Sequence, residues 1–450
     1  MKNLQKFFFA AGLMIVAACL MFTSCTKEGP QGLTGPAGKD GTNGTNGTNG
    51  KDANETCKIC HTATVVDRIA VEFQLSKHSW GEAAFEEAGN TTCAPCHEQK
   101  GLVYVCQNNT SSEFLLVNNA WVNQYTVPAD AAIGEIGCWT CHSSLHTTYG
   151  ETDLALTSVA PVSMTMWGGA KTIDLPADGG SGNLCAKCHQ PRPFTCSADP
   201  SATAKTRLLN YDSLKNFPLV VMWDSTTGAV NKYVRPSYRM HVHYGAVGAV
   251  VAGVGAIEYP GLIYSNSPHT TLASCSDCHM ANPMTGIAGG HAFNVRNAKE
   301  SALGTNTTWN FNGCNVEGCH AADPLSKTHA MWVNTRTIVK GLLEELAAKI
   351  NACGNGHDIL HKDASASNLW WGLTTNNYDG YMDIYDASVN PNGYWKLTSQ
   401  PKFPQLLNVQ MGAIINFQFC LREYSLGIHN SDYVIALMTN TIEAMEDAGF

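Results

Sequence analysis

Apolar residues recur at a helical spacing near the C-terminal end of the chain. They stand at every fourth position in Ile338, Leu342, Leu346 and Ile350, with Val339 and Leu343 beside them. This pattern predicts an amphipathic helix that is capped by Asn334 or Thr335 and ends near Gly354.

Two further helices are expected downstream. One covers residues 405–421, and the other begins with Asn430 or Ser431 as its cap and ends at about Asp447. Residues 331–450 are therefore predicted to form an α-helical module that packs over the rest of the protein.

The middle of the chain, residues 55–330, shows little regular periodicity. Gly, Pro, Asn and Ser interrupt its apolar runs often, which favours short helices and long loops. An apolar stretch over residues 217–223 is the best candidate for a strand.

The N-terminus has the pattern of an export signal. Lys2 and Lys6 precede an apolar run over residues 7–20, which is too short for a comfortable membrane span. Cys19 and Cys25 both follow lipobox-like residues, and we favour Cys25 because cleavage before Cys19 would leave an apolar end. Residues 1–24 then form a lipoprotein signal peptide; an ordinary signal peptide with incidental cysteines is the alternative.

A glycine repeat follows the predicted lipid attachment site. Gly stands at every third position from Gly29 to Gly50, and the repeat contains Pro30 and Pro36 as its only prolines. A triple helix needs more proline, so residues 25–54 are predicted to be a collagen-like linker; a trimeric stalk is the alternative.

Charge narrows the choice of partners. Only 14% of the 450 residues are charged, and the formal net charge is -9. An acidic chain argues against nucleic acid and against anionic lipid as the main partner.

The 18 cysteines and 16 histidines carry the candidate chemistry. Five segments have the form C-x-x-C-H, the pattern of c-type haem attachment, in which two thiols bond to the porphyrin and the His ligates the iron. A sixth segment has the longer form C-x4-C-H. The predicted attachment cysteines are Cys57, Cys60, Cys93, Cys96, Cys138, Cys141, Cys185, Cys188, Cys275, Cys278, Cys314 and Cys319, and the proximal histidines are His61, His97, His142, His189, His279 and His320.

Two alternatives compete with this interpretation. Zinc sites pair two half-motifs and do not need a His after each second Cys, so six endings in Cys-His argue against zinc. For the longer segment, a disulfide between Cys314 and Cys319 followed by an unrelated His is the other explanation. We therefore predict six covalent haems c within residues 55–330 and a haem-free module over 331–450.

The remaining histidines supply candidate distal ligands. Ten His are left after the six motifs, which is enough for two imidazoles on every iron. The candidates are His78, His146, His241, His243, His269 and His291. His241 and His243 would point the same way in an extended segment. His329 and His429 are reserves, and His357 and His361 are expected to be exposed.

Four cysteines lie outside the motifs and the export signal. In an oxidising compartment they are candidates for disulfides. Cys353 and Cys420 would join two C-terminal helices, and Cys106 would pair with Cys196.

The motifs give the chain a resemblance to a known class. The six haem motifs, His243-Tyr-Gly, Tyr259-Pro-Gly, Cys275-Ser-Asp-Cys-His-Met and Gly-Gly-His291-Ala-Phe resemble segments of outer-surface multihaem c-type cytochromes. The segment Ser425-Leu-Gly-Ile-His-Asn430 resembles tails of multihaem cytochromes, including relatives of nitrite reductases.

The resemblance implies a fold of loops and short helices wrapped around a haem chain, with a C-terminal α-helical module. It implies electron transfer at the outer membrane or beyond the cell, to other redox proteins or to extracellular acceptors. Some hexahaem members of this class form filaments, so a homopolymer is a further expectation.

An enzyme is the alternative function. A reductase of nitrite, hydroxylamine or a sulfur oxyanion needs a haem with an open axial position. The lysine-ended haem motif of pentahaem nitrite reductases does not occur in this sequence, which favours an electron carrier over an enzyme.

Mass analysis of the mature chain tests the motif interpretation. We expect the mass of six porphyrins added covalently to the polypeptide. A chain without porphyrin mass, or with zinc in its place, would contradict the prediction.

Overall fold

A computed structural model describes residues 62–80, 89–110, 114–117, 120–123, 125–132, 134–147, 151–193, 211–224, 241–284, 288–296, 309–356, 358–362, 377–383 and 405–450. The chain separates into two units, Met1–Asp52 and Ala53–Phe450. The first unit, with the predicted signal peptide, Cys25 and nearly all of the glycine linker, lies outside the described residues.

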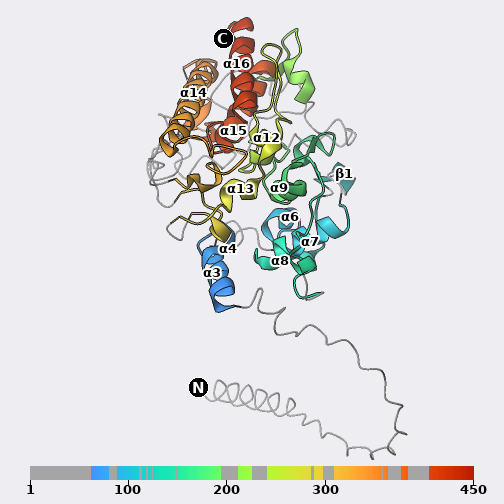
Figure 1. Cartoon of the computed structure of the whole chain (residues 1–450). Coiled ribbons are helices and arrows are strands. Elements are labelled where there is room, and N and C mark those ends of the chain that lie inside the picture. The colour runs from blue at the N-terminus through green and yellow to red at the C-terminus, as the bar shows by residue number, and fades with distance from the viewer. Residues whose placement is uncertain are drawn as a thin grey trace, which may run out of the picture. The chain divides into compact units, whose positions relative to one another are not determined.

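Short helices and loops make up the part of the second unit that carries the cysteine motifs, as the sequence predicts (Figure 1). The interruptions by Gly and Pro keep most of the helices there below three turns. The α-helices are α3 (Ala63–Gln74), α4 (Lys77–Trp80), α6 (Ala94–His97), α7 (Gln99–Gln107), α8 (Cys138–Cys141), α9 (Ala177–Cys188), α11 (Val247–Ala252), α12 (His269–Leu272) and α13 (Cys275–His279).

The described strands form four two-stranded antiparallel pairs. The pairs are β1 (Phe114–Val117) with β2 (Ala120–Asn123), β3 (Val162–Ser163) with β4 (Thr172–Ile173), β5 (Val221–Asp224) with β8 (Gln405–Leu407), and β6 (Leu360–Lys362) with β7 (Tyr378–Met382). The predicted strand over 217–223 begins later, at Val221, because the chain reaches β8 only there. This pairing ties the motif-bearing region to the C-terminal one.

Three longer helices follow: α14 (Leu325–Ala352), α15 (Asn408–Arg422) and α16 (Ser431–Asp447), which pack against one another (Figure 1). The bounds of α16 are as predicted, and the Asn430 side chain caps it by accepting a hydrogen bond from the Tyr433 amide. No described helix is long and apolar enough to cross a lipid bilayer.

The predictions for the other two helices need correction. α14 begins at Leu325 after Pro324, about three turns before the predicted cap, and so it crosses the expected boundary at residue 331. Proline suits a helix start because its missing amide hydrogen would have no partner there. The predicted 405–421 helix begins at Asn408, since residues 405–407 form β8.

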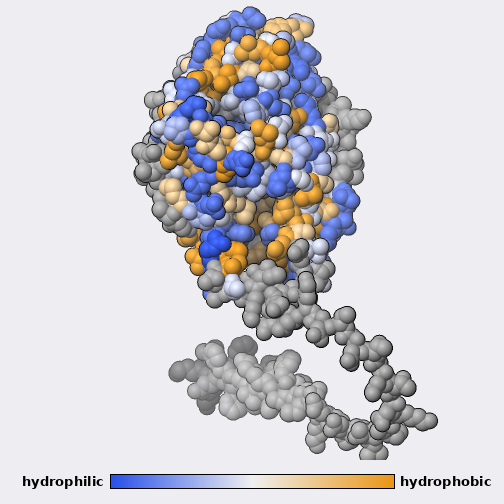
Figure 2. All heavy atoms as spheres, viewed as in Figure 1, coloured by the Kyte–Doolittle hydropathy of each residue, from blue (hydrophilic) through white to orange (hydrophobic). Residues whose placement is uncertain are grey.

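One hydrophobic core joins the C-terminal helices to the region before them. It contains Met164 and Tyr259 from the motif-bearing region together with Leu343 of α14, Phe417 of α15 and Leu437 of α16. Every residue of α15 is buried, so this helix runs through the centre of the core. At the surface, Figure 2 shows polar and apolar residues interspersed over the face in view.

The buried face of α14 differs slightly from the predicted stripe. Val339, Leu343, Leu346 and Ile350 are buried, whereas Ile338 is 43% exposed. The side of the apolar stripe that includes Val339 and Leu343 therefore faces the core.

Replacing Leu343 by Ala tests this packing. Leu343 is fully buried, so we expect the variant to lose about 2 to 5 kcal/mol of unfolding free energy, from lost burial and a residual cavity. Ile338→Ala, in the same helix, serves as the matched control and should cost about 1 kcal/mol or less. Equal losses in denaturant titrations would show that the two side chains are packed alike.

Candidate haem-ligation site

Each described C-x-x-C-H motif folds into one helical turn. In α6, α8, α9 and α13 the two cysteines lie three residues apart, which places both thiols on one face of the turn. The following His amide closes the turn by donating to the carbonyl of the first cysteine, at 3.1 Å for His97, 2.9 Å for His142 and 2.9 Å for His189. This compact turn sets the imidazole beside the two thiols.

The longer motif closes in the same way. The His320 amide donates to the Cys314 carbonyl at 3.0 Å, although two more residues stand between the cysteines. Gly318 absorbs the extra length with a φ of +85°, which favours glycine. The Asn315 side chain then fixes the loop by donating to the His320 carbonyl at 3.0 Å. The segment thus has the local geometry of the other motifs.

Four motif imidazoles each face a second imidazole from elsewhere in the chain. The ring centres are 6.1 Å apart for His78 and His189, 6.2 Å for His97 and His243, 6.2 Å for His279 and His429, and 6.4 Å for His269 and His320. The four separations agree within a few tenths of an ångström, even though the rings come from unrelated elements.

His291 lies in the neighbourhood of His142. Burial lowers the pKa of His291, the Glu72 carboxylate raises it, and His142 adds a smaller lowering. The backbone amide of His291 donates to the buried Glu72 carboxylate at 3.0 Å, which holds this segment against α3. The first motif, Cys57, Cys60 and His61, lies outside the described residues, as does His357.

The ring nitrogens are oriented for metal ligation. Nδ1 lies 2.9 Å from the Leu154 carbonyl in His142, 2.9 Å from the Phe293 carbonyl in His279, and 2.8 Å from the Ile428 carbonyl in His269. A carbonyl only accepts, so Nδ1 carries the proton in each of these rings, and Nε2 keeps its lone pair. Metal-binding histidines are oriented by this kind of hydrogen bond.

His429 has a carboxylate in the same position. Its Nδ1 lies 2.7 Å from Glu423 Oε2. Burial alone would raise the pKa of Glu423, but hydrogen bonds from His429, Ser425 and the Gly427 amide bring it below its ordinary value.

The separation of the paired rings fits an iron between them. Two metal–nitrogen bonds of about 2 Å each, plus the distance from each ring centre to its nitrogen, add up to about 6 Å. The thiols beside one ring of each pair supply the covalent attachment of a haem c. The residues present therefore fit a bis-histidine haem at each of these pairs.

Thiols of different motifs also meet. A hydrogen bond with the Cys188 thiol lowers the pKa of Cys96, and a hydrogen bond with the Cys275 thiol lowers the pKa of Cys185. The second, fourth and fifth motifs are therefore adjacent, with the fourth in the middle.

His189 of the fourth motif lies at the centre of the paired rings. Burial lowers its pKa to about 4, and His78, His279, His429 and His97 add to the lowering. These four imidazoles belong to three different ring pairs, so His189 is surrounded by the other ligation sites.

Several predicted ligands are placed differently from the expectation. His243 has a φ of +67°, so the segment is not extended; its ring is nearly parallel to that of His241, with the ring centres 6.1 Å apart. His241 Nδ1 accepts hydrogen bonds from Arg422 at 2.8 Å and from the His243 amide at 2.8 Å. Its neutral ring then carries the proton on Nε2, unlike the rings described above.

Three other histidines complete the comparison. His146 is exposed, with its ring 5.8 Å from that of Trp139. His429, only a reserve candidate in the sequence, faces His279. The expectation that His361 is exposed is wrong: its side chain is 17% exposed and its Nδ1 lies 2.7 Å from Asp379. The Gly-rich surroundings of His361 concealed its place on β6.

The cysteines outside the motifs do not form the predicted staple. Cys353 and Cys420 are both free, with Cys420 fully buried in the core and the Cys353 thiol donating to the Lys349 carbonyl of its own helix. Cys106 is free, and Cys196 lies outside the described residues.

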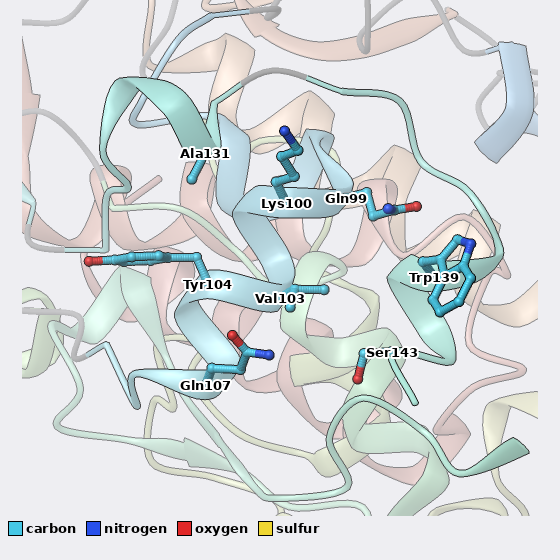
Figure 3. Close-up of a pocket in the computed structure, with 8 residues that line it drawn as sticks. All are labelled: Gln99, Lys100, Val103, Tyr104, Gln107, Ala131, Trp139 and Ser143. Atoms are coloured by element: carbon cyan, nitrogen blue, oxygen red, sulfur yellow. The ribbon is translucent and has the colours of Figure 1, made fainter. Parts of the chain in front are cut away.

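Two further observations concern the surroundings of the motifs. Within the described ranges, no three His, Cys, Asp or Glu side chains converge on one point. An open depression of about 320 Å³ between α7 and α8 is lined by Gln99, Lys100, Val103, Tyr104, Gln107, Ala131, Trp139 and Ser143 (Figure 3). None of these eight is a Cys or His, but Trp139 lies inside the third motif and Ser143 follows His142, so the depression borders that motif.

The comparisons with known proteins find a distant similarity to multihaem c-type cytochromes. Two curated proteins are similar to the chain, both named C-type polyheme cytochrome OmcB, from the DL-1/KN400 and PCA strains of Geobacter sulfurreducens. Each is 22% identical over 399 residues, which is 82% of this chain and 46% of the relative, so the chain spans about half the length of the relatives it matches. No protein-family model and no solved structure matches the chain.

A pair of variants tests the His97–His243 arrangement. Because His243 faces His97, His243→Ala should leave one haem with an empty axial position, seen as a new high-spin fraction in the absorption and electron paramagnetic resonance spectra. His241→Ala, two residues away, should remain entirely low-spin. A high-spin haem in His241→Ala but not in His243→Ala would reverse the assignment.

Proposed function

We propose that this protein is an electron carrier that holds six haems c, each bound through two thioethers and ligated by two imidazoles. The observation that carries the proposal is the set of four motif imidazoles that each face a second imidazole at 6.1 to 6.4 Å. The polyheme cytochromes to which the chain is similar support the same class.

The assigned ligand pairs follow from this geometry. His97 pairs with His243, His189 with His78, His279 with His429 and His320 with His269, and His291 is the partner of His142. The partner of His61 is left among the remaining histidines, with His146 as the candidate from the sequence. His241, the other candidate, is disfavoured because its Nδ1 already accepts two hydrogen bonds. An iron with two imidazole ligands exchanges single electrons and offers no open position to a substrate.

The chain's own residues arrange these sites for transfer. Thiol contacts between Cys96 and Cys188 and between Cys185 and Cys275 bring the attachment points of neighbouring groups together. Burial of His78, His189 and His279 keeps water from the ligating nitrogens and keeps the imidazoles neutral, because it lowers their pKa values. The described fold would wrap around such a group of haems.

The export signal and the cysteine at position 25 support the location in this proposal. We place the protein at the outer membrane or cell surface, anchored by lipid at Cys25, with redox proteins or extracellular acceptors as partners. Growth into a homopolymeric filament is part of the same proposal and would be visible by electron microscopy of shed material.

Carbon monoxide added to the fully reduced protein tests the electron-carrier function. With every iron held by two imidazoles, we expect no shift in the absorption spectrum. A fraction that binds carbon monoxide would show an open haem, and would favour a reductase of nitrite, hydroxylamine or a sulfur oxyanion instead.

A further inference from the structure

The connection between α15 and α16 contains a buried carboxylate that touches one of the paired imidazoles. The side chain of Glu423 has no exposed surface. Its oxygens accept hydrogen bonds from His429 Nδ1 at 2.7 Å, from the Gly427 amide at 2.9 Å and from the Ser425 hydroxyl. Three donors directed at one carboxyl group stabilise its ionised form.

This arrangement differs from that of the other ligands with described Nδ1 contacts. Neutral backbone carbonyls accept from His142, His269 and His279. Asp323 near His320 is a carboxylate, but it is 3.4 Å away, partly exposed, and paired with Lys327 at 2.6 Å. Glu72 is almost as buried, but its Oε2 lies 3.9 Å from His291 Nδ1, which is too far for a hydrogen bond. Among these rings, His429 is thus the one held by a fully buried carboxylate.

The surrounding structure keeps Glu423 and His429 in place. The connection bends through Tyr424, Leu426 and Gly427, all with positive φ. Arg336, whose guanidinium lies over Trp332 and Trp309, donates to the Ser425 carbonyl at 2.9 Å. A side chain at position 427 would meet Val339 of α14, so glycine is needed for this close approach. These contacts hold the carboxylate in place beside His429.

A fixed anion beside Nδ1 changes the ligand that Nε2 offers. It draws the Nδ1 proton toward itself and makes the imidazole a stronger donor, as second-shell carboxylates do for metal-bound histidines. A stronger donor stabilises the more highly charged oxidised iron over the reduced one. Hydrogen bonding around the ligand is one of the ways in which a protein sets a haem potential.

We propose that Glu423 is a positioning residue that lowers the reduction potential of the haem held between His279 and His429. The inference rests on the proposed function, because it requires a haem at this pair. Under this inference the ligation sites are not equivalent. The connection between α15 and α16 distinguishes the His279–His429 site from the others.

Glu423→Gln is the direct test, since the amide keeps the size of the side chain but removes its charge. In a spectroscopic redox titration, one of the six components should move to higher potential while the others stay. The near-infrared charge-transfer band of one low-spin haem should shift as well, which a purely structural role would not cause. Glu446→Gln, which removes an exposed carboxylate that pairs with Lys349 at 2.8 Å, is the matched control and should leave every component in place.

A second variant keeps the test decisive if Glu423→Gln folds poorly. Ser425→Ala removes one of the three donors to Glu423, and also the acceptor of the His429 amide at 3.0 Å, so the spin state is recorded beside the potential. Where the haem stays low-spin, Glu423 should attract the His429 proton more strongly. The same component should then move to lower potential. Unchanged components in both variants, or shifts of the opposite sign, would overturn the proposal.

His429→Ala separates this inference from the proposed function. The covalent haem count should remain six, and one haem should become high-spin. If all haems stay low-spin, His429 is not a ligand and the role of Glu423 is refuted, while the electron carrier stands. If the wild-type protein holds no porphyrin, the proposed function itself fails.

Discussion

We propose that one constraint governs the structure: two imidazoles from distant parts of the chain must face each other with room for an iron between them. One imidazole is placed by its own motif, because a one-turn helix fixes it beside its two thiols. The other imidazole must be positioned by the tertiary structure. His78 comes from a short helix between the first two motifs, His243 from a bend between the fourth and fifth, and His429 from the connection between the last two helices. The fold is best understood as the means of delivering these second rings.

The C-terminal helices take part in that delivery, beyond covering a core. Arg422 at the end of α15 is fully buried and donates to His241 and to the His243 carbonyl, which holds the segment that carries His243. Next in the chain, Glu423 holds His429. The Ile428 carbonyl accepts from His269. A stretch of a few residues therefore orients three of the proposed distal ligands, and the burial of α15 on all sides gives that stretch a rigid base.

The sequence alone predicts the features that depend on residues close together in the chain. The motif turns and the bounds of α16 depend on residues a few positions apart, so spacing and capping predict them. The partners of the motif histidines depend on which loops meet, and no local pattern records that. The sequence places His429 only among the reserve ligands. The carboxylate that positions it, Glu423, looks like an ordinary charged residue in the sequence, because its burial depends on the tertiary structure. The apolar spacing predicts the same burial for Ile338 and Leu343, because it does not show which edge of the apolar stripe faces the core. The expected Cys353–Cys420 disulfide ignored that Cys420 is buried among apolar side chains.

The positions of the irons test the account most directly. Crystals of the haem-loaded protein, measured on both sides of the iron absorption edge, locate each iron by its anomalous signal. The account predicts an iron midway between the rings of His97 and His243, His189 and His78, His279 and His429, and His320 and His269. Irons away from these midpoints, or paired with other side chains, would contradict it.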